Sequence, residues 1–381
     1  MRIALFESIM TPGGHEIEFD RICVEEIRAM GHEVAFYVPQ KHKFQYEYGV
    51  PVHYLPGEGV TYAGVGRLAK IWYAAKREIN RLRWYNALYD LAGQKAFDAV
   101  IVPTASFRFL RSLTKTRLKN APLNVILILH GIMPRDEENF FKYAESLIEY
   151  PAVKIAVLTP EDNIFGRLPD NVYCVKPPVY IPRDVPERRK DQSGDKLRLG
   201  FFGQYRREKN LDAFLEMFVA ANFPPNVELF VQGATVEPSD TADFDRIIAK
   251  YRDNKQIVFL HKALIGREWQ EAILGVDALI LPYAAERFRY QPSAMLYTAI
   301  GFHKPVVVAD NMSPGVFDRY DIGVQFATGD NASLLAALKK FVTTYDDKYP
   351  VYRQELERIN ADYGPGKMAE DLIKIAKSNQ R

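Results

Sequence analysis

The chain has 381 residues, 48% of them hydrophobic and 26% charged, which is enough to bury the cores of about two to three domains without disulfides or metals. This composition excludes an intrinsically disordered or fibrous protein. The formal net charge of only +2 excludes a uniformly basic nucleic-acid-binding protein, although it is compatible with a local basic surface.

The cysteine content and the N-terminus indicate the compartment. Cys23 and Cys174 are too few and too far apart in sequence for a disulfide framework or a multi-cysteine metal site, so a reducing compartment is expected. The first residues lack the basic region and apolar core of a signal peptide, and no apolar run approaches the roughly 18 residues of a transmembrane helix. We therefore expect a cytoplasmic protein, soluble or held peripherally at the inner face of a membrane.

The N-terminal half shows a repeated strand–helix pattern. A short apolar run at 2–6, a Gly-Gly turn, a helical pattern at 17–30 and a second strand at 34–38 predict a βαβ unit with a parallel sheet. Further buried strands are predicted at 99–102, 125–129 and 154–158. The stretch 177–194 is rich in proline and charge and has no periodicity, so it is the best candidate for a linker.

The strand–helix pattern restarts after this linker. Strands are predicted at 197–202, 227–231, 257–260, 278–281 and 306–309, and helices at 211–220, 243–251, 268–274 and 332–342. The simplest interpretation is two consecutive doubly wound α/β domains, at 1–185 and 195–360, followed by an amphipathic helix within 361–381. We expect ligand to bind in a cleft between the domains, at the carboxyl ends of both sheets.

A polar loop at 203–210 follows the first strand of the second domain. Gly203 stands at the strand end, and Arg206 and Lys209 come just before the next helix. A tight turn, backbone donors and two cations suit a diphosphate. A solvated basic loop fits the charge alone equally well.

The same loop resembles the phosphate loop of the GT-B glycosyltransferases, above all those of family 4, which often read G-x-x-R-x-x-K-N at this place. Gly203, Arg206, Lys209 and Asn210 match this pattern, while Gln204 stands where another form of the motif has arginine. The resemblance implies that Gly203, Arg206 and Lys209 bind the diphosphate of the donor. It also implies two Rossmann-like domains, of which the first binds the acceptor and receives the last helix, and the second binds a nucleotide sugar as substrate, with no cofactor.

The resemblance extends into the first domain. Pro12-Gly13-Gly14-His15 looks like the opening loop of the family, in which glycine lets the backbone approach the nucleotide sugar, so Gly13 and Gly14 are implied donor contacts. His130 ends a predicted buried strand, and in similar enzymes a histidine at this place lies beside the transferred sugar. A satisfied histidine at a sheet edge is the alternative.

The second family motif is not intact, which marks a divergent branch. Family 4 enzymes usually carry two glutamates eight positions apart; here Glu286 matches the first, but the second falls on Thr298, 12 positions on, which can make at most a weaker contact. The insertion brings Gln291, Ser293 and Ala294 to the start of a predicted helix. Its free N–H groups and the Ser293 hydroxyl are further candidates for binding the donor phosphate.

Residues 61–120 form a basic segment with twelve Lys or Arg and three Asp or Glu, a local net charge of +9 against −7 for the rest of the chain. Basic and aromatic residues interleave, which suits an anionic membrane surface or acceptor; a solvated helix face over a buried aromatic stripe is the alternative. No nucleic-acid-binding motif accompanies the charge. The candidate surface residues are Lys70, Trp72, Lys76, Arg77, Arg81, Arg83, Trp84, Arg108, Arg111 and Lys115.

The resemblance implies that the chain is a glycosyltransferase of the hexosyltransferase type. It would transfer a sugar from a nucleotide-diphosphate donor, with a UDP-sugar favoured, to a lipid-linked or growing glycan acceptor. Retention of configuration would use His130 and Glu286 as sugar contacts, whereas inversion needs a general base, for which the candidates are His15, Glu18 and Asp20.

Neither scheme needs a metal, because no Asp-x-Asp motif or His/Cys cluster offers a metal site. Two other functions stay open: a nucleotide-sugar epimerase of the same fold, and an inactive homologue that acts as a binding subunit.

Overall fold

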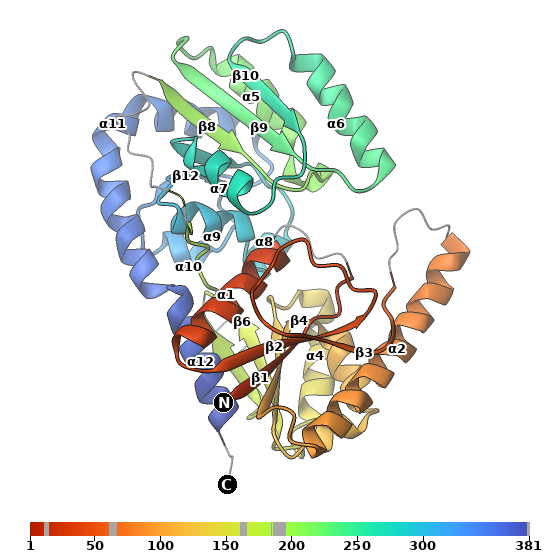
Figure 1. Ribbon diagram of the computed structural model, residues 1–381. Coiled ribbons are helices and arrows are strands. Elements are labelled where there is room, and N and C mark those ends of the chain that lie inside the picture. The colour runs from red at the N-terminus through yellow and green to blue at the C-terminus, as the bar shows by residue number, and fades with distance from the viewer. Residues whose placement is uncertain (11–14, 61–66, 161–165, 184, 186–195, 379–381) are drawn as a thin grey trace. The chain divides into compact units, whose positions relative to one another are not determined.

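The computed structural model describes residues 1–10, 15–60, 67–160, 166–183, 185 and 196–378. The chain forms two compact units, one made of Met1–Pro178 with Pro365–Arg381 and the other of Val179–Gly364. Each unit contains one parallel β-sheet with helices packed on it (Figure 1).

The sheet of the first unit has seven strands in the order β3-β2-β1-β4-β5-β6-β7, all parallel. The sequential order reverses between β1 and β4, which is the switch point of a doubly wound fold. The strands are β1 (Arg2–Phe6), β2 (Glu33–Gln40), β3 (Val52–Glu58), β4 (Ala99–Ala105), β5 (Asn124–Leu129), β6 (Val153–Leu158) and β7 (Val172–Val175).

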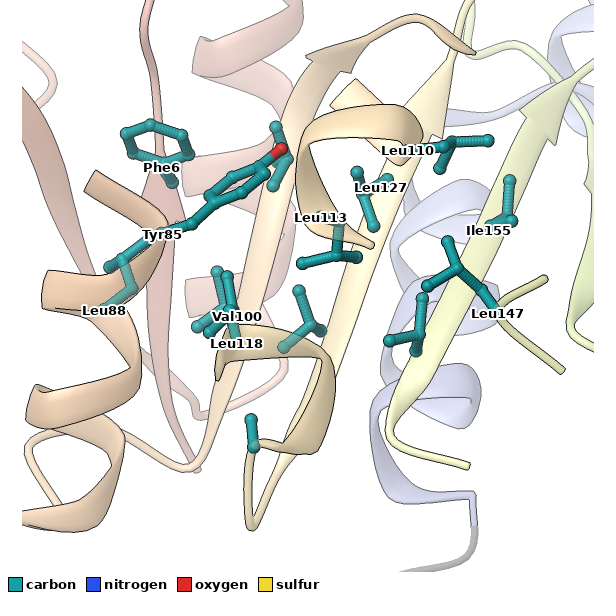
Figure 2. Close-up of a cluster of buried hydrophobic side chains, with 14 of the residues drawn as sticks. Phe6, Tyr85, Leu88, Val100, Leu110, Leu113, Leu118, Leu127, Leu147 and Ile155 are labelled. Carbon is teal, nitrogen blue, oxygen red and sulfur yellow. The ribbon is translucent and has the colours of Figure 1, made fainter. Parts of the chain in front are cut away.

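Helices cover both faces of this sheet (Figure 1). On one face lie α2 (Arg67–Gly93), α3 (Phe107–Leu113) and α4 (Pro134–Glu145); on the other lie α1 (His15–Ala29) and α12 (Pro365–Lys377). Figure 2 shows the core under the first group, where Leu88 of α2 and Leu113 of α3 pack with Val100 and Leu127 of the sheet. The strands β5 and β6 are buried along their whole length because both of their faces are covered.

The sheet of the second unit has six parallel strands in the order β10-β9-β8-β11-β12-β13. It repeats the doubly wound order, with the reversal between β8 and β11. The strands are β8 (Leu197–Phe201), β9 (Val227–Gly233), β10 (Ile257–His261), β11 (Ala278–Leu281), β12 (Val306–Ala309) and β13 (Gly323–Phe326).

The helices of the second unit include one that is unusually long. They are α5 (Leu211–Ala221), α6 (Pro238–Tyr251), α7 (Arg267–Leu274), α8 (Arg287–Tyr290), α9 (Ala294–Gly301), α10 (Pro314–Phe317) and α11 (Asn331–Asp362). The long helix α11 packs on α5, α9 and β13. The doubly wound architecture that the sequence predicts for both halves is confirmed.

Several elements were not predicted from the sequence. β3 is an edge strand in which only Leu55 is buried, so it carries no apolar run or alternation. β7 and β13 are only partly buried, whereas the predicted strands β11 and β12, which have the same length of four residues, are buried throughout. The helix α2 extends over 27 residues where the sequence showed only a basic, aromatic segment.

Candidate functional site

The candidate site of the second unit lies at its switch point. The loop 203–210 follows β8, and the segment 282–293 follows β11, so both leave the sheet at the carboxyl edge where doubly wound folds bind ligands. The two segments are bonded to each other. The Ala284 N–H donates to the carbonyl of Glu208 (3.2 Å), and Arg287 Nη2 lies 2.6 Å from Glu208 Oε1.

Lys209 and the start of α9 both approach Gly203, the first residue of the loop 203–210. Its φ of +106° lies in the region that disfavours side chains, and a Cβ here would lie 3.0 Å from Lys209 Nζ and 3.7 Å from Met295 Sδ in the first turn of α9. The Gly203 N–H donates to Gln232 Oε1 (2.9 Å), so this backbone donor is already used within the protein. The Gly203 N–H is therefore not available to a ligand at this edge.

Lys209 is a buried cation, 7% exposed, and within the described ranges no carboxylate forms an ion pair with it. Its Nζ lies 5.1 Å from the ring centroid of Tyr283 and 3.5 Å from the Phe202 carbonyl. Burial, together with the charges of Arg206 and Arg287, lowers the pKa of Lys209 to about 7. A desolvated amine without a counterion is poised to gain from a bound anion.

Two arginines flank this amine. Arg206 is exposed, and its recorded side-chain bond is a long one, 3.4 Å to Gln204 Oε1. Arg287 is one-third exposed and pairs with Glu208. Neither Arg287 nor Tyr283 was predicted as a site residue, although both lie close to Glu286 in the segment after β11.

The helix α9 begins at Ala294 beside this cluster. Ser293 is its N-cap and accepts a bond from the Leu296 N–H at 3.5 Å, which leaves other N–H groups of the first turn without partners inside the helix. Thr298 is buried, and its hydroxyl donates to the Ala294 carbonyl (2.8 Å) within the same helix. The Thr298 hydroxyl therefore already donates its proton within the protein and needs no ligand as acceptor.

The remaining predicted residues of this segment flank α8. Glu286 is exposed at the N-cap of α8, and Gln291 is partly buried at its C-cap, where its backbone N–H donates to the Arg287 carbonyl (2.8 Å). The structure thus brings together Gly203, Lys209 and Met295 in the first turn of α9.

In the first unit, His130 follows β5 at the carboxyl edge of the sheet. Its Nε2 lies 2.9 Å from the Pro103 carbonyl, which can only accept, so Nε2 carries the proton and Nδ1 is the acceptor of the ring. The ring packs edge-on against Phe19 (4.6 Å between centroids) and His15 (5.6 Å). Burial, and then the charge of His15, lower the pKa of His130 to about 4, so the ring is neutral at physiological pH.

The three candidate bases differ in availability. Glu18 is buried and ion-paired with Arg21 (2.7 Å), and Asp20 is 1% exposed with its pKa raised well above the ordinary value, mainly by burial and then by Glu7 and Glu16. His15 is the first residue of α1, with its side chain 39% exposed. The predicted donor contacts Gly13 and Gly14 lie outside the described residues.

Glu7, directly after β1, is a buried acid that sequence reasoning missed. It is 1% exposed, its Oε1 accepts a bond from the Ile9 N–H (2.5 Å), and no described residue bonds its Oε2. Burial raises the pKa of Glu7 to about 8. A single glutamate after an apolar strand gives no sequence signal that its side chain is enclosed.

The basic surface proposed from the sequence needs a correction, because Arg81 and Trp84 lie in the interior at 4% and 1% exposure. The cause is the helical period of α2, which turns both side chains toward the core. The Arg81 guanidinium bonds Glu78 Oε2 (3.0 Å) and Ser112 Oγ (3.1 Å) and lies 4.0 Å from the ring centroid of Phe109.

The other residues of that prediction are distributed over α2 and α3. Trp72 is 62% exposed, with Lys76 Nζ 5.5 Å from its ring centroid, and Arg83, Arg108 and Lys115 are exposed. Arg77 is partly buried, and Arg111 pairs with Glu78 (3.3 Å). Lys70 lies in α2, but its side chain is outside the described part.

Within the described residues, no group of three His, Cys, Asp or Glu side chains is placed to hold a metal ion. In the same part of the chain, no helix is both long and apolar enough to cross a membrane.

Comparison with solved structures places the fold. No family model and no curated protein matches the sequence. The chain is similar over 98% of its length to sucrose-phosphate synthase from Thermosynechococcus elongatus (TM-score 0.69, 13% identity, 98% of that chain). It is also similar to Anabaena HepE in complex with UDP and glucose (TM-score 0.66, 12% identity, 99% of this chain and 100% of that chain). A glycosyltransferase from Rickettsia africae gives a TM-score of 0.69 at 10% identity, covering 100% of this chain and 99% of that chain. The chain therefore has the GT-B fold of glycosyltransferases.

Proposed function

We propose that this protein is a glycosyltransferase that takes a sugar from a nucleotide-diphosphate donor, held by the second unit. The observation that carries the proposal is Lys209, a buried amine without a carboxylate partner among the described residues, at the carboxyl edge of the switch point. A diphosphate there would meet Lys209, Arg206 and the free N–H groups of α9. These groups would stabilise the negative charge that develops on the leaving nucleotide.

We favour a UDP-sugar as donor and retention of configuration. The HepE structures that share the fold hold UDP, or UDP and glucose. Inversion needs a base in the first unit, and two of its three candidates, Glu18 and Asp20, are ion-paired or deeply buried. On this scheme no metal is required, and neutral His130 accepts a hydroxyl bond through Nδ1.

A lipid-linked or growing glycan acceptor is the counterpart that we propose for the first unit. Support comes from a stripe on α2, formed by Trp72, Lys76, Ile79 and Arg83, whose four-, three- and four-residue spacings place them on one helix face, away from the buried Arg81 and Trp84. Such a face fits an anionic membrane surface. Flotation with vesicles of phosphatidylglycerol should carry the protein at low salt and release it at high salt; binding that is absent or insensitive to salt would contradict this part.

The donor site is tested by nucleotide binding. UDP at 100 times its dissociation constant should stabilise the protein by about 2.7 kcal/mol in a thermal-shift measurement. Lys209→Met should weaken UDP binding at least tenfold, because it removes a desolvated cation from the diphosphate. The matched control is Lys255→Met, an exposed lysine of the same unit, which should leave UDP affinity unchanged. If UDP, ADP and GDP all fail to bind, the proposed donor site is wrong.

Turnover distinguishes the proposed reaction from the alternatives. Transfer should require an acceptor, and NMR should find the same anomeric configuration in donor and product. An epimerase would convert the donor without acceptor, whereas an inactive binding subunit would bind the nucleotide and transfer nothing.

A further inference from the structure

We propose that Tyr205 is a positioning residue that sets the conformation of the phosphate loop before the donor binds. The inference rests on the proposed function, because it concerns how the same loop receives a diphosphate. Tyr205 lies between Gly203 and Lys209 in sequence and is only 2% exposed, whereas its neighbours Arg206 and Arg207 are exposed. Its side chain therefore points into the unit while the loop runs along the edge of the sheet.

Three contacts hold Tyr205. Its hydroxyl donates to Asp243 Oδ2 of α6 at 2.6 Å, and its ring lies 5.1 Å from that of Phe244. Its backbone N–H donates to the carbonyl of Ala234, just after β9, at 2.7 Å. The loop is regular only in the short turn Arg207–Lys209, so these contacts and the Gly203–Gln232 bond fix its first half.

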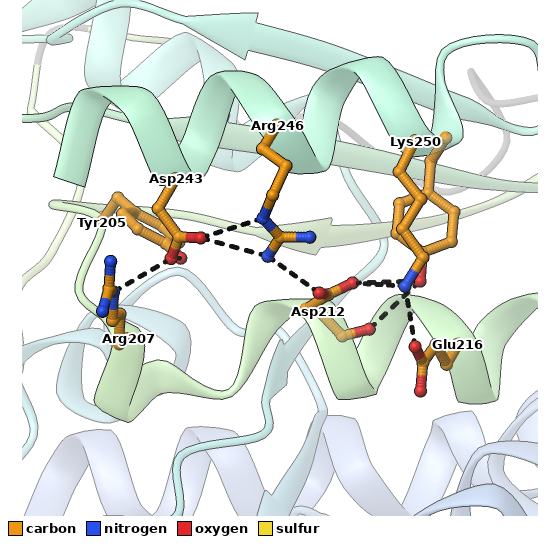
Figure 3. Close-up of polar contacts among 8 residues, drawn as sticks. Tyr205, Arg207, Asp212, Glu216, Asp243, Arg246 and Lys250 are labelled. Carbon is orange, nitrogen blue, oxygen red and sulfur yellow. Dashed lines mark hydrogen bonds and ion pairs between the residues drawn. The ribbon is translucent and has the colours of Figure 1, made fainter. Parts of the chain in front are cut away.

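Asp243 is itself held in place by a network of charged side chains between α5 and α6 (Figure 3). Its Oδ1 accepts from Arg246 Nε and Nη2, both at 3.1 Å, and Arg246 Nη2 also reaches Asp212 Oδ2 at 2.9 Å. Asp212 in turn accepts from Lys250 Nζ (2.9 Å) and the Tyr251 hydroxyl (3.2 Å). The acceptor of the Tyr205 hydroxyl is thus anchored to two helices.

The Asp243 carboxylate also pairs with one of the cations of the loop. Arg207 Nε lies 3.2 Å from Asp243 Oδ2, so Arg207 is partly neutralised. Across the described residues, no ion pair is recorded for Arg206 or Lys209, so those two stay available for phosphate. A loop that is already ordered loses less conformational entropy when it binds a diphosphate. Loss of the Tyr205–Asp243 hydrogen bond should therefore lower the affinity for phosphates and leave the contacts to the nucleoside unchanged.

The test is Tyr205→Phe, which removes one hydroxyl and no charge. The dissociation constants of UDP and uridine are measured by calorimetry and by NMR titration. The variant should bind UDP about 3- to 10-fold more weakly than the wild type and uridine equally well, because only the phosphates contact the loop. The control is Tyr251→Phe, a tyrosine of the same network whose hydroxyl bonds Asp212 on the side away from the loop. It should leave both constants unchanged, even if both variants melt at slightly lower temperature.

A second pair of variants changes Asp243, which accepts the hydrogen bond of the Tyr205 hydroxyl. Asp243→Asn and Asp243→Ala remove the same charge, but only the asparagine keeps an oxygen that accepts the Tyr205 hydroxyl. The ratio of uridine to UDP dissociation constants should fall further in the alanine variant than in the asparagine variant. If Tyr205→Phe keeps the wild-type ratio, or if the two Asp243 variants agree, Tyr205 has no positioning role and the donor site stands. If the wild type itself prefers UDP no more than uridine, the proposed function fails together with this inference.

Discussion

At the scale of the residue, burial decides which side chains are charged at the two sheet edges. Burial removes water from three ionisable side chains and so disfavours their charged forms. It lowers the pKa of Lys209 and of His130, and it raises the pKa of Glu7. Lys209 is the member of this set that a bound anion would restore to full charge. Burial therefore lowers the pKa of the Lys209 amine, to which the proposed function assigns a polyanion, and keeps the His130 ring neutral.

Glu7 predicts a pH dependence of stability. Its pKa is raised to about 8 in the folded protein, so between about pH 4.5 and 8 the unfolded chain is ionised at this group while the folded chain holds the proton. Stability should therefore fall as pH rises through this window. Glu16 from α1 adds to the effect, because its negative charge nearby raises the cost of ionising Glu7. Asp20 faces the same group, and its own pKa is raised as well, mainly by burial and then by Glu7.

Glu7→Gln should remove part of this slope, because glutamine does not ionise. Denaturant unfolding at pH 5 and pH 8 should show the variant gaining on the wild type at the higher pH, by on the order of a few kcal/mol. Glu145→Gln, an exposed carboxylate of α4, is the control and should follow the wild type. A wild-type slope in Glu7→Gln would mean that Glu7 ionises as in an unfolded chain.

At the scale of the element, α2 carries two tryptophans in opposite environments. Trp84 is 1% exposed and lies edge-on to Phe6 (6.0 Å between centroids), while Trp72 is 62% exposed. Twelve residues separate them, which at about 100° per residue is one-third of a turn beyond three full turns. Because both residues are tryptophans, composition alone does not show which of the two is buried.

The two tryptophans should therefore respond differently to truncation. Trp84→Ala should lower the free energy of unfolding by about 3–5 kcal/mol, because it leaves a cavity in a packed core. Trp72→Ala should change it by no more than about 0.5 kcal/mol. Chemical denaturation followed by circular dichroism measures both. Equal losses in the two variants would contradict the burial of Trp84 or the exposure of Trp72.

At the scale of the whole molecule, the first unit is completed by the last helix of the chain. The helix α12 packs on α1 and β5, and its buried residues include Met368, Leu372 and Ile375. Asn124 at the start of β5 donates through Nδ2 to the carbonyls of Ile375 (3.3 Å) and Ala376 (2.8 Å) near the helix C-terminus. The first unit is thus built from both ends of the sequence.

Removal of residues 365–381 should therefore destabilise the first unit selectively. Each buried Leu, Ile or Met side chain contributes about 1.5–3 kcal/mol, so several of them approach the whole stability of a typical domain. Hydrogen exchange by mass spectrometry should show lost protection in β1, β4 and β5 and retained protection in β8 to β12. The milder variant Asn124→Ala should lower the free energy of unfolding by about 1–3 kcal/mol, because it leaves buried carbonyls unpaired. Its control is Asn86→Ala, which loses one exposed hydrogen bond and should lower this free energy by less. Uniform loss of protection in both units would contradict this division.

The sequence by itself determined most strands of the two sheets and the grouping of glycine, arginine and lysine in the loop 203–210. Runs such as 125–129 and 306–309 are buried on both faces, so they are apolar without interruption and can be recognised locally. The glycine, arginine and lysine of the loop 203–210 are likewise neighbours in the chain, so their combination is visible without coordinates.

Only the tertiary structure decided which distant side chains meet. Asp243 is 38 residues from Tyr205, and Tyr283 is 74 residues from the Lys209 amine beside its ring. Arg81 and Trp84 belong to a basic, aromatic segment in the sequence, yet the direction in which α2 packs turns them inward. A one-dimensional pattern records the hydrophobicity and charge of each residue, whereas enclosure, and with it the charge of Lys209 and Glu7, depends on neighbours that the fold brings from elsewhere.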